Sequence, residues 1–396
     1  MANPYVRTTC FISTTVFALT PSHHEIKTGK LSKQPLPASH AHHLCAYHEA
    51  DAALTRQAIE DALAAKGEWE NMPWHDRAAI FLKAADLISG KYRYEIMAAT
   101  ILGQGKNAWQ AEIDAAAEVC FFPSLPVPPL PLKCPHLIPV SAEGPPIAIL
   151  PHFHVIFHTF TESLLQLADF FRFGVKCVEE LYSQQPPENA QYCWNRLEYR
   201  PLEGFVLAVS PFNFTAIGGN LAGAPALVGN VVLWKPSSTA TYSNYLIHRI
   251  LLEAGLPPSV IQFVPGPPAQ VVTTALGHRD FAGLHFTGST KVFRSLWKEI
   301  GNNVGQGAYK SYPRVVGETG GKNWHLVHQS ADVKNAVLQS VRSAFEYQGQ
   351  FFISSSLPSS MLGAQHADRS EVLSTFKTLR SFVSVAPVQA DAFGGD

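Results

Sequence analysis

Apolar positions between residues 51 and 118 recur at the spacing of amphipathic helices. Asp51 precedes the first apolar series and can cap it, and Gly67 stands near its end. Pro73 lies in the first turn of the next helix, which Gly90 closes. The helices expected here cover 51–67, 73–90, a stretch from Tyr94, and 108–120.

After residue 204 the pattern changes to short apolar runs that alternate with helical segments. The expected strands are Phe205–Val209, Val231–Trp234, Ile261–Val264, Gly283–Phe286 and Asn323–Val327. The expected helices are 215–228, 239–254, 289–301 and 332–347. Such alternation predicts an α/β fold, a Rossmann-like parallel sheet with helices on both faces. Ligands of these sheets bind at the carboxyl ends of the strands.

A proline-rich block separates the two patterns. Ten prolines and two charged side chains fall between Phe121 and Pro151, a density that excludes helix and central strand. We expect an extended linker, and a docking motif for an SH3 or WW domain is the less favoured alternative. A helix over 169–182 and a polar connection over 183–199 lead on to the first strand.

Composition narrows the functional classes. The 396 residues are 46% hydrophobic and 15% charged with a net charge of −1, so a large core is expected and an electrostatic nucleic-acid binder is not. We find no apolar run long and unbroken enough to predict a membrane span. The N-terminus has Arg7 and no acid before residue 20, which is compatible with an organellar transit peptide or a disordered start.

The six cysteines are interpreted as reduced thiols, because none forms a C-x-x-C pair. A zinc site is the alternative, and its ligands would come from five side chains: His40, His42, His43, Cys45 and His48. Their spacing matches no four-ligand pattern, so we expect no metal and a solvated histidine-rich stretch.

Four polar or glycine-containing motifs follow predicted strands. Asn213, in an S-P-F-N-F turn, can donate its amide to a developing oxyanion, and Lys235 can bind a ribose hydroxyl or a phosphate. Gly288 and Ser289 precede a helix whose N-terminal amides can hold a pyrophosphate. Glu318, in a glycine-rich turn, can act as a general base if burial makes it more basic. Each motif alone is equally explained by an ordinary turn, cap or surface side chain.

In this order and spacing the motifs resemble the NAD(P)-dependent aldehyde dehydrogenase superfamily. Four strings are similar to its delta-1-pyrroline-5-carboxylate dehydrogenase family: AEIDAAAE at 111–118, DFFRF at 169–173, SPFNFTAIGGNLAGAPAL at 210–227 and RSAFEY at 342–347. That family oxidises L-glutamate γ-semialdehyde to glutamate in mitochondrial proline breakdown. The resemblance covers roughly 45–120 and 168–350.

The resemblance implies NAD as the cofactor and a role for each motif. Asn213 would be the oxyanion donor, Glu318 the base that activates water, and Lys235 the residue that holds the adenosine ribose. Ser210 would lie in the site for a small aldehyde substrate. The pyrophosphate would rest on Gly288, Ser289, Thr290, Lys291 and Val292. Members of the family are homo-oligomers of the mitochondrial matrix.

The sequence departs from the family pattern at the expected nucleophile. The family's cysteine stands two residues after Gln350, where this sequence has Phe352. We expect the tail after Gln350 to lack the family's catalytic domain and oligomerising strand, and the Pro-rich block to interrupt one family helix. Three alternatives follow: an enzyme of this family, for which the missing nucleophile makes turnover the less favoured outcome, a catalytically dead NAD-binding protein, or a non-functional isoform or gene model.

The expected organisation has five parts. They are a possibly transit-like N-terminal segment (1–44), the N-terminal helical part of the NAD-binding domain (45–120), a Pro-rich insertion (121–167), the Rossmann-like NAD-binding domain (168–350) and a tail outside the family (351–396). Apolar surface that no further domain covers predicts poor solubility.

Overall fold

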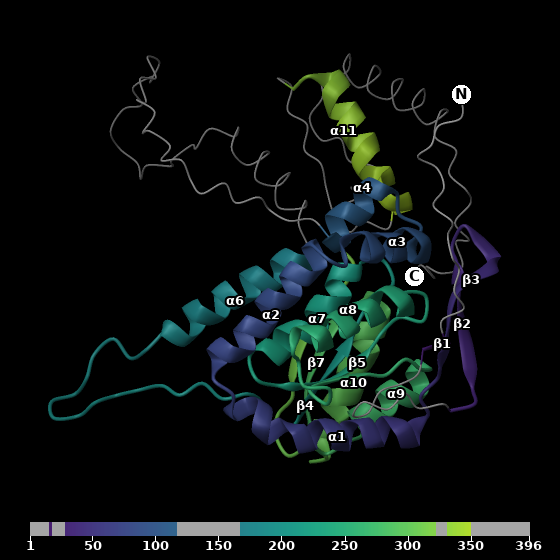
Figure 1. Cartoon of the computed structure of the whole chain (residues 1–396). Coiled ribbons are helices and arrows are strands. Elements are labelled where there is room, and N and C mark those ends of the chain that lie inside the picture. The colour runs from purple at the N-terminus through teal and green to yellow at the C-terminus, as the bar shows by residue number, and fades with distance from the viewer. Residues whose placement is uncertain (1–15, 18–27, 117–166, 322–330, 350–396) are drawn as a thin grey trace, which may run out of the picture.

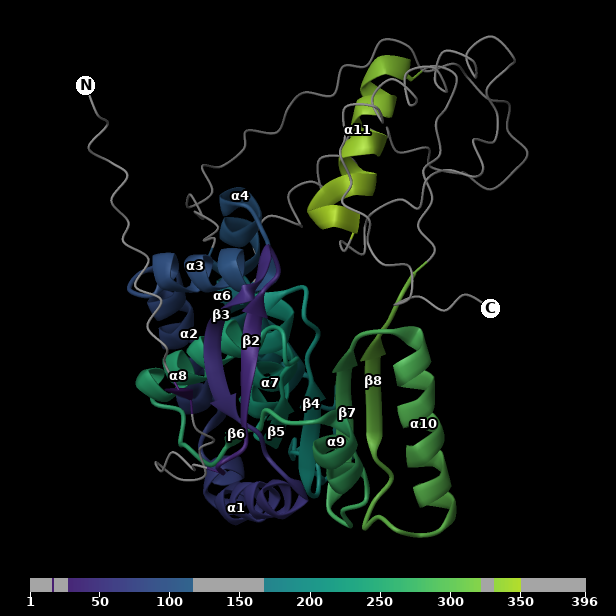
Figure 2. The same ribbon diagram turned by 90° about the vertical axis from the view of Figure 1, so that its right-hand side faces the viewer.

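The computed structural model describes residues 16–17, 28–116, 167–321 and 331–349. At its centre lies a five-stranded parallel sheet with strand order β6-β5-β4-β7-β8 (Figure 1, Figure 2). The strands are β4 (Phe205–Val209), β5 (Val231–Lys235), β6 (Ile261–Phe263), β7 (Phe281–Thr287) and β8 (Arg314–Glu318). The chain runs outwards from β4 to β6 and then returns to the other side of β4. The direction of strand addition therefore reverses between β4 and β7.

The inner strands are apolar along their length because helices cover both faces of the sheet. Every residue of β5 is buried, and Phe205 and Leu207 of β4 are fully enclosed. β8 at the edge differs, since Arg314 and Val316 are exposed. Its register against β7 pairs Thr287 with Glu318, which brings both strand ends to the same edge.

Two pairs of helices connect the strands. α7 (Thr215–Leu227) and α8 (Thr241–Ala254) link β4 to β5 and β5 to β6, and α9 (Pro268–Leu276) and α10 (Thr290–Gly305) follow on the return path. Right-handed crossovers place these pairs on opposite faces of the sheet. α1 (Ala52–Asn71) packs against α9, and α10 lies beside β8 in Figure 2.

An outer layer of helices covers α7 and α8 (Figure 1). It consists of α2 (Trp74–Ser89), α3 (Arg93–Gln104) and α6 (Leu167–Ser183). One side chain of α1 and one of α2 bind the end of α7. The Trp69 indole donates to the Ala226 carbonyl at 2.9 Å, and the Arg77 guanidinium donates to the Leu227 carbonyl at 3.1 Å. The helices and the sheet thus share one hydrophobic core.

The remaining helical elements come before the Pro-rich block or after the sheet in the sequence. α4 (Ala108–Ala111) continues as a π-helix, η1 (Glu112–Ala116), which packs against α6. α11 (Val333–Phe345) ends in a 3₁₀ turn, η2 (Glu346–Gly349). Ala115 and Leu167 are both fully buried in the common core, so the described residues on either side of the Pro-rich block belong to neighbouring elements.

A small sheet of order β1-β3-β2 lies against α8. It comprises β1 (Val16–Phe17), β2 (Leu31–Leu36) and β3 (Ser39–His48). Gln34 attaches it, because its side-chain amide donates to the Thr239 carbonyl at 2.7 Å and its carbonyl accepts from the Tyr242 amide at 2.9 Å. Gln34 is fully buried, and these hydrogen bonds satisfy its side-chain amide, as is usual for buried polar groups.

Most predicted elements are confirmed with shifts of a few residues at their ends, and β4 matches its prediction. The Asp51 cap is also confirmed, since its side chain accepts from the Leu54 amide at 2.8 Å. Gly67, however, lies inside α1, which continues to Asn71. Pro73 precedes the first turn of α2 rather than standing in it.

Other expectations need correction. β8, α9 and the three strands of the small sheet, β1 to β3, were not predicted, and the histidine-rich stretch is strand β3, in which Cys45 and His48 are buried rather than solvated. The expected strand Asn323–Val327, the Pro-rich block and the tail after Gln350 lie outside the described residues.

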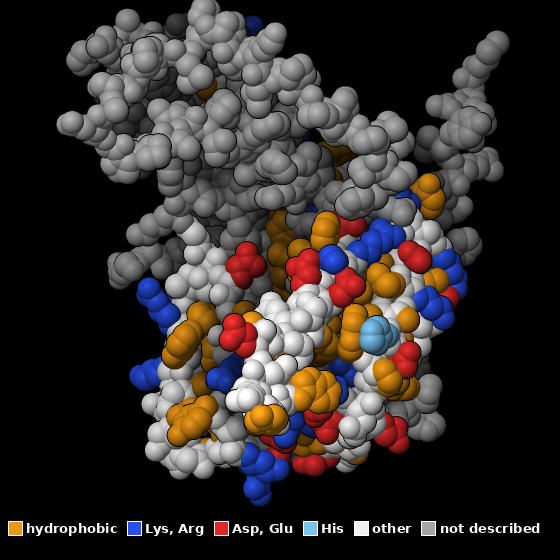
Figure 3. Space-filling model, turned by 90° about the vertical axis from the view of Figure 1, so that its left-hand side faces the viewer, with side chains coloured by type: hydrophobic (Ala, Val, Ile, Leu, Met, Phe, Trp, Pro, Cys, Tyr) orange, Lys and Arg blue, Asp and Glu red, His pale blue; other side chains and the backbone are white. Residues whose placement is uncertain are grey.

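Exposed apolar side chains gather on the polar connection after α6. Tyr192 is 97% exposed and Trp194 is 80% exposed. Figure 3 shows the face toward which this connection projects, where apolar side chains alternate with charged ones. Within the described residues, no helix is long and apolar enough to cross a membrane.

Candidate active site at the strand ends

The four motifs meet at the carboxyl edge of the sheet. Ser210 follows β4, Lys235 ends β5, Gly288 follows β7 and Glu318 ends β8. Backbone hydrogen bonds join them in pairs, from the Ser210 amide to the Lys235 carbonyl at 3.2 Å and from the Gly288 amide to the Glu318 carbonyl at 3.1 Å. The strand order reverses between β4 and β7, and open parallel sheets bind ligands at such a reversal.

The turn after β4 is anchored from the interior. Ser210 is buried, and its hydroxyl accepts from the Trp234 indole at 3.1 Å and from the Asn244 amide at 3.4 Å. Asn213 is buried as well, whereas Phe212 is exposed. The Ser210 hydroxyl therefore holds the turn to β5 and α8, and its contact with a substrate stays a prediction. Asn213 stands immediately before the start of α7.

Lys235 is a buried amine without a counter-charge. Only 7% of it is exposed, and across the described part of the chain we find no hydrogen bond or ion pair to its side chain. Burial lowers the pKa of Lys235 to about 8. A buried amine without a partner is stabilised by a ligand whose hydroxyl or phosphate oxygens accept its hydrogen bonds. Lys235 therefore fits the ribose of a dinucleotide.

The start of α10 lies on the same edge. Ser289 caps the helix, since its hydroxyl accepts from the Val292 amide at 3.3 Å. Gly288 lies so close to Phe286 that an added Cβ would come within 2.8 Å of the ring. The remaining amides of the first turn and the helix dipole suit a pyrophosphate. The other residues assigned to that group, Thr290 and Lys291, follow directly in this turn.

Glu318 is the last residue of β8 and does not lie in a turn, which corrects the prediction. Its side chain is exposed, and the described residues do not bury it. Gly317 beside it packs against Phe293, whose ring a Cβ at this position would overlap. Phe293 in turn stacks on Phe286 at a centroid distance of 5.5 Å. These rings fix the end of β8 relative to the start of α10.

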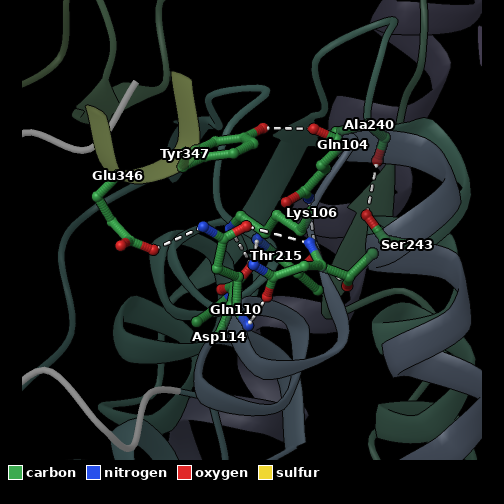
Figure 4. A network of polar contacts seen from close by, with 12 residues as sticks. Gln104, Lys106, Gln110, Asp114, Thr215, Ala240, Ser243, Glu346 and Tyr347 are labelled. Atoms are coloured by element: carbon green, nitrogen blue, oxygen red, sulfur yellow. Dashed lines mark hydrogen bonds and ion pairs between the residues drawn. The ribbon is translucent and has the colours of Figure 1, made fainter. Parts of the chain in front are cut away.

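A second polar cluster, which no sequence pattern indicated, lies at Thr215, the first residue of α7 (Figure 4). Lys106 and Asp114 form an ion pair of 2.7 Å, and their side chains are 2% and 1% exposed. The Asp114 carboxylate also accepts from the backbone amides of Thr215 and Ala216, each at 2.9 Å. The N-cap residue of α7 makes no side-chain hydrogen bond to the helix. The Asp114 carboxylate instead accepts hydrogen bonds from amides of the first turn, and its negative charge interacts favourably with the helix dipole.

The described residues contain no group of three or more His, Cys, Asp or Glu side chains that could hold a metal ion. Cys45 donates its thiol to the side-chain carbonyl of Gln34 at 3.7 Å. Burial raises the pKa of Cys45 to about 12, which disfavours the thiolate that a metal needs. His40 and His42 are exposed on the same strand, so the ligands considered for zinc do not converge.

Comparison with known proteins identifies the family. The model of the aldehyde dehydrogenase family matches residues 29–123 and 156–358, which is well over half of the chain. This match begins earlier and ends later than the resemblance that the motifs indicated, and its interruption falls on the Pro-rich block.

Individual relatives agree with the family match. A delta-1-pyrroline-5-carboxylate dehydrogenase of Agaricus bisporus is 60% identical over 326 residues, 82% of this chain and 50% of the relative. The human mitochondrial protein of the same name is 46% identical over 326 residues and is covered to 49%. The chain thus spans about half the length of the curated relatives it matches.

Solved structures give the same result. The crystal structure of the delta-pyrroline-5-carboxylate dehydrogenase from Mycobacterium tuberculosis bound with NAD matches with a TM-score of 0.68 and 40% identity. The match covers 83% of this chain and 52% of that protein. The five-stranded sheet and its helices are therefore those of an aldehyde dehydrogenase over about half of the fold.

Proposed function

Because the chain belongs to the aldehyde dehydrogenase family, we propose that its described part is the NAD-binding region of a delta-1-pyrroline-5-carboxylate dehydrogenase. The observation that carries this proposal is the Lys235 amine, which is buried without a counter-charge on the edge where α10 begins. A buried charge without a partner destabilises a fold, so a bound polar ligand explains why the site contains one.

In the proposed site, different residues bind different parts of the dinucleotide. Lys235 donates to the hydroxyls of the adenosine ribose, and the first-turn amides of Thr290 and Lys291 receive the pyrophosphate. Gly288 lets the backbone approach it closely. Bound NAD supplies the hydride acceptor for the reaction. The relatives solved with NAD support this choice of cofactor.

The substrate in this proposal is L-glutamate γ-semialdehyde, and the product is glutamate. Asn213 would donate its amide to the negative charge that develops on the aldehyde oxygen when the family's thiolate adds to the carbonyl carbon, and Glu318 would accept a proton from the water that releases the acyl group. Ser210 contributes to the wall of the substrate site. Relatives named mitochondrial delta-1-pyrroline-5-carboxylate dehydrogenase support this choice of substrate and a mitochondrial location, and the matrix is what the family resemblance implies.

We do not expect turnover from the printed sequence by itself. The resemblance places the nucleophile two residues after Gln350, where Phe352 has neither a thiol nor acid–base chemistry. A second candidate function is therefore NAD binding without catalysis, and the sequence at 352 favours it.

Calorimetric titration with NAD tests the proposal. We expect a saturable 1:1 isotherm for the unchanged chain and loss of most of the affinity in Lys235→Met, because the amine that meets the ribose is removed. Absence of binding at millimolar NAD would overturn the proposal. The family resemblance requires a thiol as the nucleophile. Formation of NADH from glutamate semialdehyde that survived thiol alkylation would contradict that requirement.

A further inference from the structure

One buried cation touches both the turn that carries Asn213 and the segment that ends α11. The Lys106 ammonium lies 3.9 Å from the centroid of the Phe214 ring and 4.8 Å from that of the Tyr347 ring. The two rings meet edge to face at 6.4 Å. Phe214 directly follows Asn213 and is more than 130 residues from Tyr347 in the sequence, so the cation and the two rings join distant segments of the chain.

Lys106 acts on the chain after Asn213 through the carboxylate of Asp114. Lys106 pairs with Asp114, and Asp114 accepts the amides of Thr215 and Ala216. Thr215 is held a second time through its side chain, since its hydroxyl accepts from the Gln104 amide at 2.7 Å. The residues after Asn213 are therefore fixed by their backbone and by their side chains.

On the other side, Glu346 and Tyr347 are docked on the same elements. The Tyr347 hydroxyl donates to the Gln104 carbonyl at 2.7 Å, and the Gln110 amide donates to the Glu346 carboxylate at 2.6 Å (Figure 4). Tyr347 adopts a left-handed backbone conformation with φ of 49°, which a bulky residue keeps only where its surroundings hold it. The docking is thus specific, although α11 itself lies at the periphery.

We propose that Lys106 is a positioning residue that fixes α11 and Tyr347 against the Asn213 turn. It acts through Asp114 and the two rings and does not touch the substrate. This inference rests on the proposed function, in which Asn213 is the oxyanion donor and the family's nucleophile follows Gln350. The consequence is that the turn of the oxyanion donor and the described residues Glu346–Gly349, which precede the family's nucleophile position in the sequence, share one anchor.

Hydrogen exchange of the full chain tests the proposal. Lys106→Met removes the cation but keeps most of the volume, and Asp114 retains its two amide donors. We expect amides of α11, and those of Thr215 and Ala216, to exchange roughly tenfold faster, with unchanged exchange in α8. Lys106→Arg restores the charge and is expected to restore most of the protection.

The matched control is Lys91→Met. The Lys91 ammonium also lies 4.8 Å from an aromatic ring, that of Tyr92, and pairs with a carboxylate, Glu253, but it is exposed. We expect this variant to leave α11 and α7 unchanged. The contrast separates the anchor from any general effect of losing a lysine beside a ring.

Two results would overturn the proposal: unchanged exchange of α11 in Lys106→Met, or faster exchange throughout the chain, α8 included. If that variant does not fold, Tyr347→Leu gives the same test from the peripheral side, and unchanged exchange of α11 there also overturns it. The exchange experiment needs no NAD, so its outcome is separate from failure of the chain to bind the dinucleotide.

Discussion

Two buried lysines of the described region differ in their surroundings, because Lys106 has partners within the fold and Lys235 has none among the described residues, and we assign them different tasks. Lys106 has a carboxylate and two aromatic rings around it, so its charge is compensated within the fold. Burial lowers its pKa, and Asp114 opposes that shift. Lys235 has only burial acting on its pKa. We interpret the first as part of the framework and the second as a group kept for a ligand.

The first prediction concerns the stability of Lys235→Met. The pKa of Lys235 falls to about 8 in the folded chain from an unfolded value of 10.5, so the unfolded chain binds more protons between these values. The penalty of the buried charge is complete below pH 8 and is lost as the pH rises toward 10.5. Removing the amine should therefore stabilise the free chain at pH 7 by up to about 3 kcal/mol while it weakens NAD binding.

Urea unfolding at several pH values measures this. The unchanged chain should gain stability between pH 8 and 10.5 relative to Lys235→Met, and the two curves should converge at the alkaline end. A variant that is less stable than the unchanged chain at pH 7 would show that the amine has a partner within the protein.

Residue roles were predictable from the sequence only where a local signal marks them. Lys235 ends an apolar strand, and its place in the order of the four motifs, rather than its position alone, suggested a ligand. The cluster around Lys106 gives no such signal, because Asp114 meets Thr215 across 101 positions and Tyr347 meets Gln104 across 243. Lys106 and Asp114 stand among other polar residues of the sequence, such as Asn107, Gln110 and Glu112, so nothing local distinguishes them.

At the level of elements, the N-terminus of α10 is the part that a ligand should use. Ser289 caps this helix and Asp51 caps α1, each through a hydrogen bond to an amide three residues on. We expect Ser289→Ala and Asp51→Ala to cost about 1 kcal/mol each, because each leaves a helix amide without its partner. Only Ser289→Ala should also weaken NAD binding, as measured by calorimetry, and an equal loss in both variants would contradict the site.

The packing of α10 on β8 gives a second prediction at this scale. Gly317→Ala should destabilise the chain by about 1–3 kcal/mol, because the new Cβ would overlap the Phe293 ring. Thermal unfolding measures the loss. Combining it with Phe293→Leu should return part of the stability, since the smaller side chain makes room. Additive losses in the double variant would show that the two residues do not compete for space.

Elements with a continuous apolar run could be predicted almost to the residue, as β4 shows. β8 could not, because it lies at the sheet edge with Arg314 and Val316 exposed and therefore lacks that run. The β2–β3 pair was hidden by Pro35 and by the histidines of β3, which weaken the usual strand pattern. Its position is determined by contacts of Gln34 with α8, which are distant in the sequence.

For the whole molecule, the exposed connection after α6 predicts self-association. Tyr192 and Trp194 are among its most exposed side chains, and large apolar groups in contact with water favour association. Light scattering after size exclusion should show concentration-dependent oligomers. Replacing both residues by serine should reduce them without changing the melting temperature. A monodisperse monomer of the unchanged chain would contradict this expectation.

The central claim is that separate strand ends form one dinucleotide site. Hydrogen exchange with and without NAD tests it most directly, because it reports on each strand end separately. NAD should slow exchange both in the first turn of α10, from Thr290, and in the backbone that follows Lys235, while α1 stays unchanged. Binding of NAD that protects neither segment, or only one of them, would contradict the account.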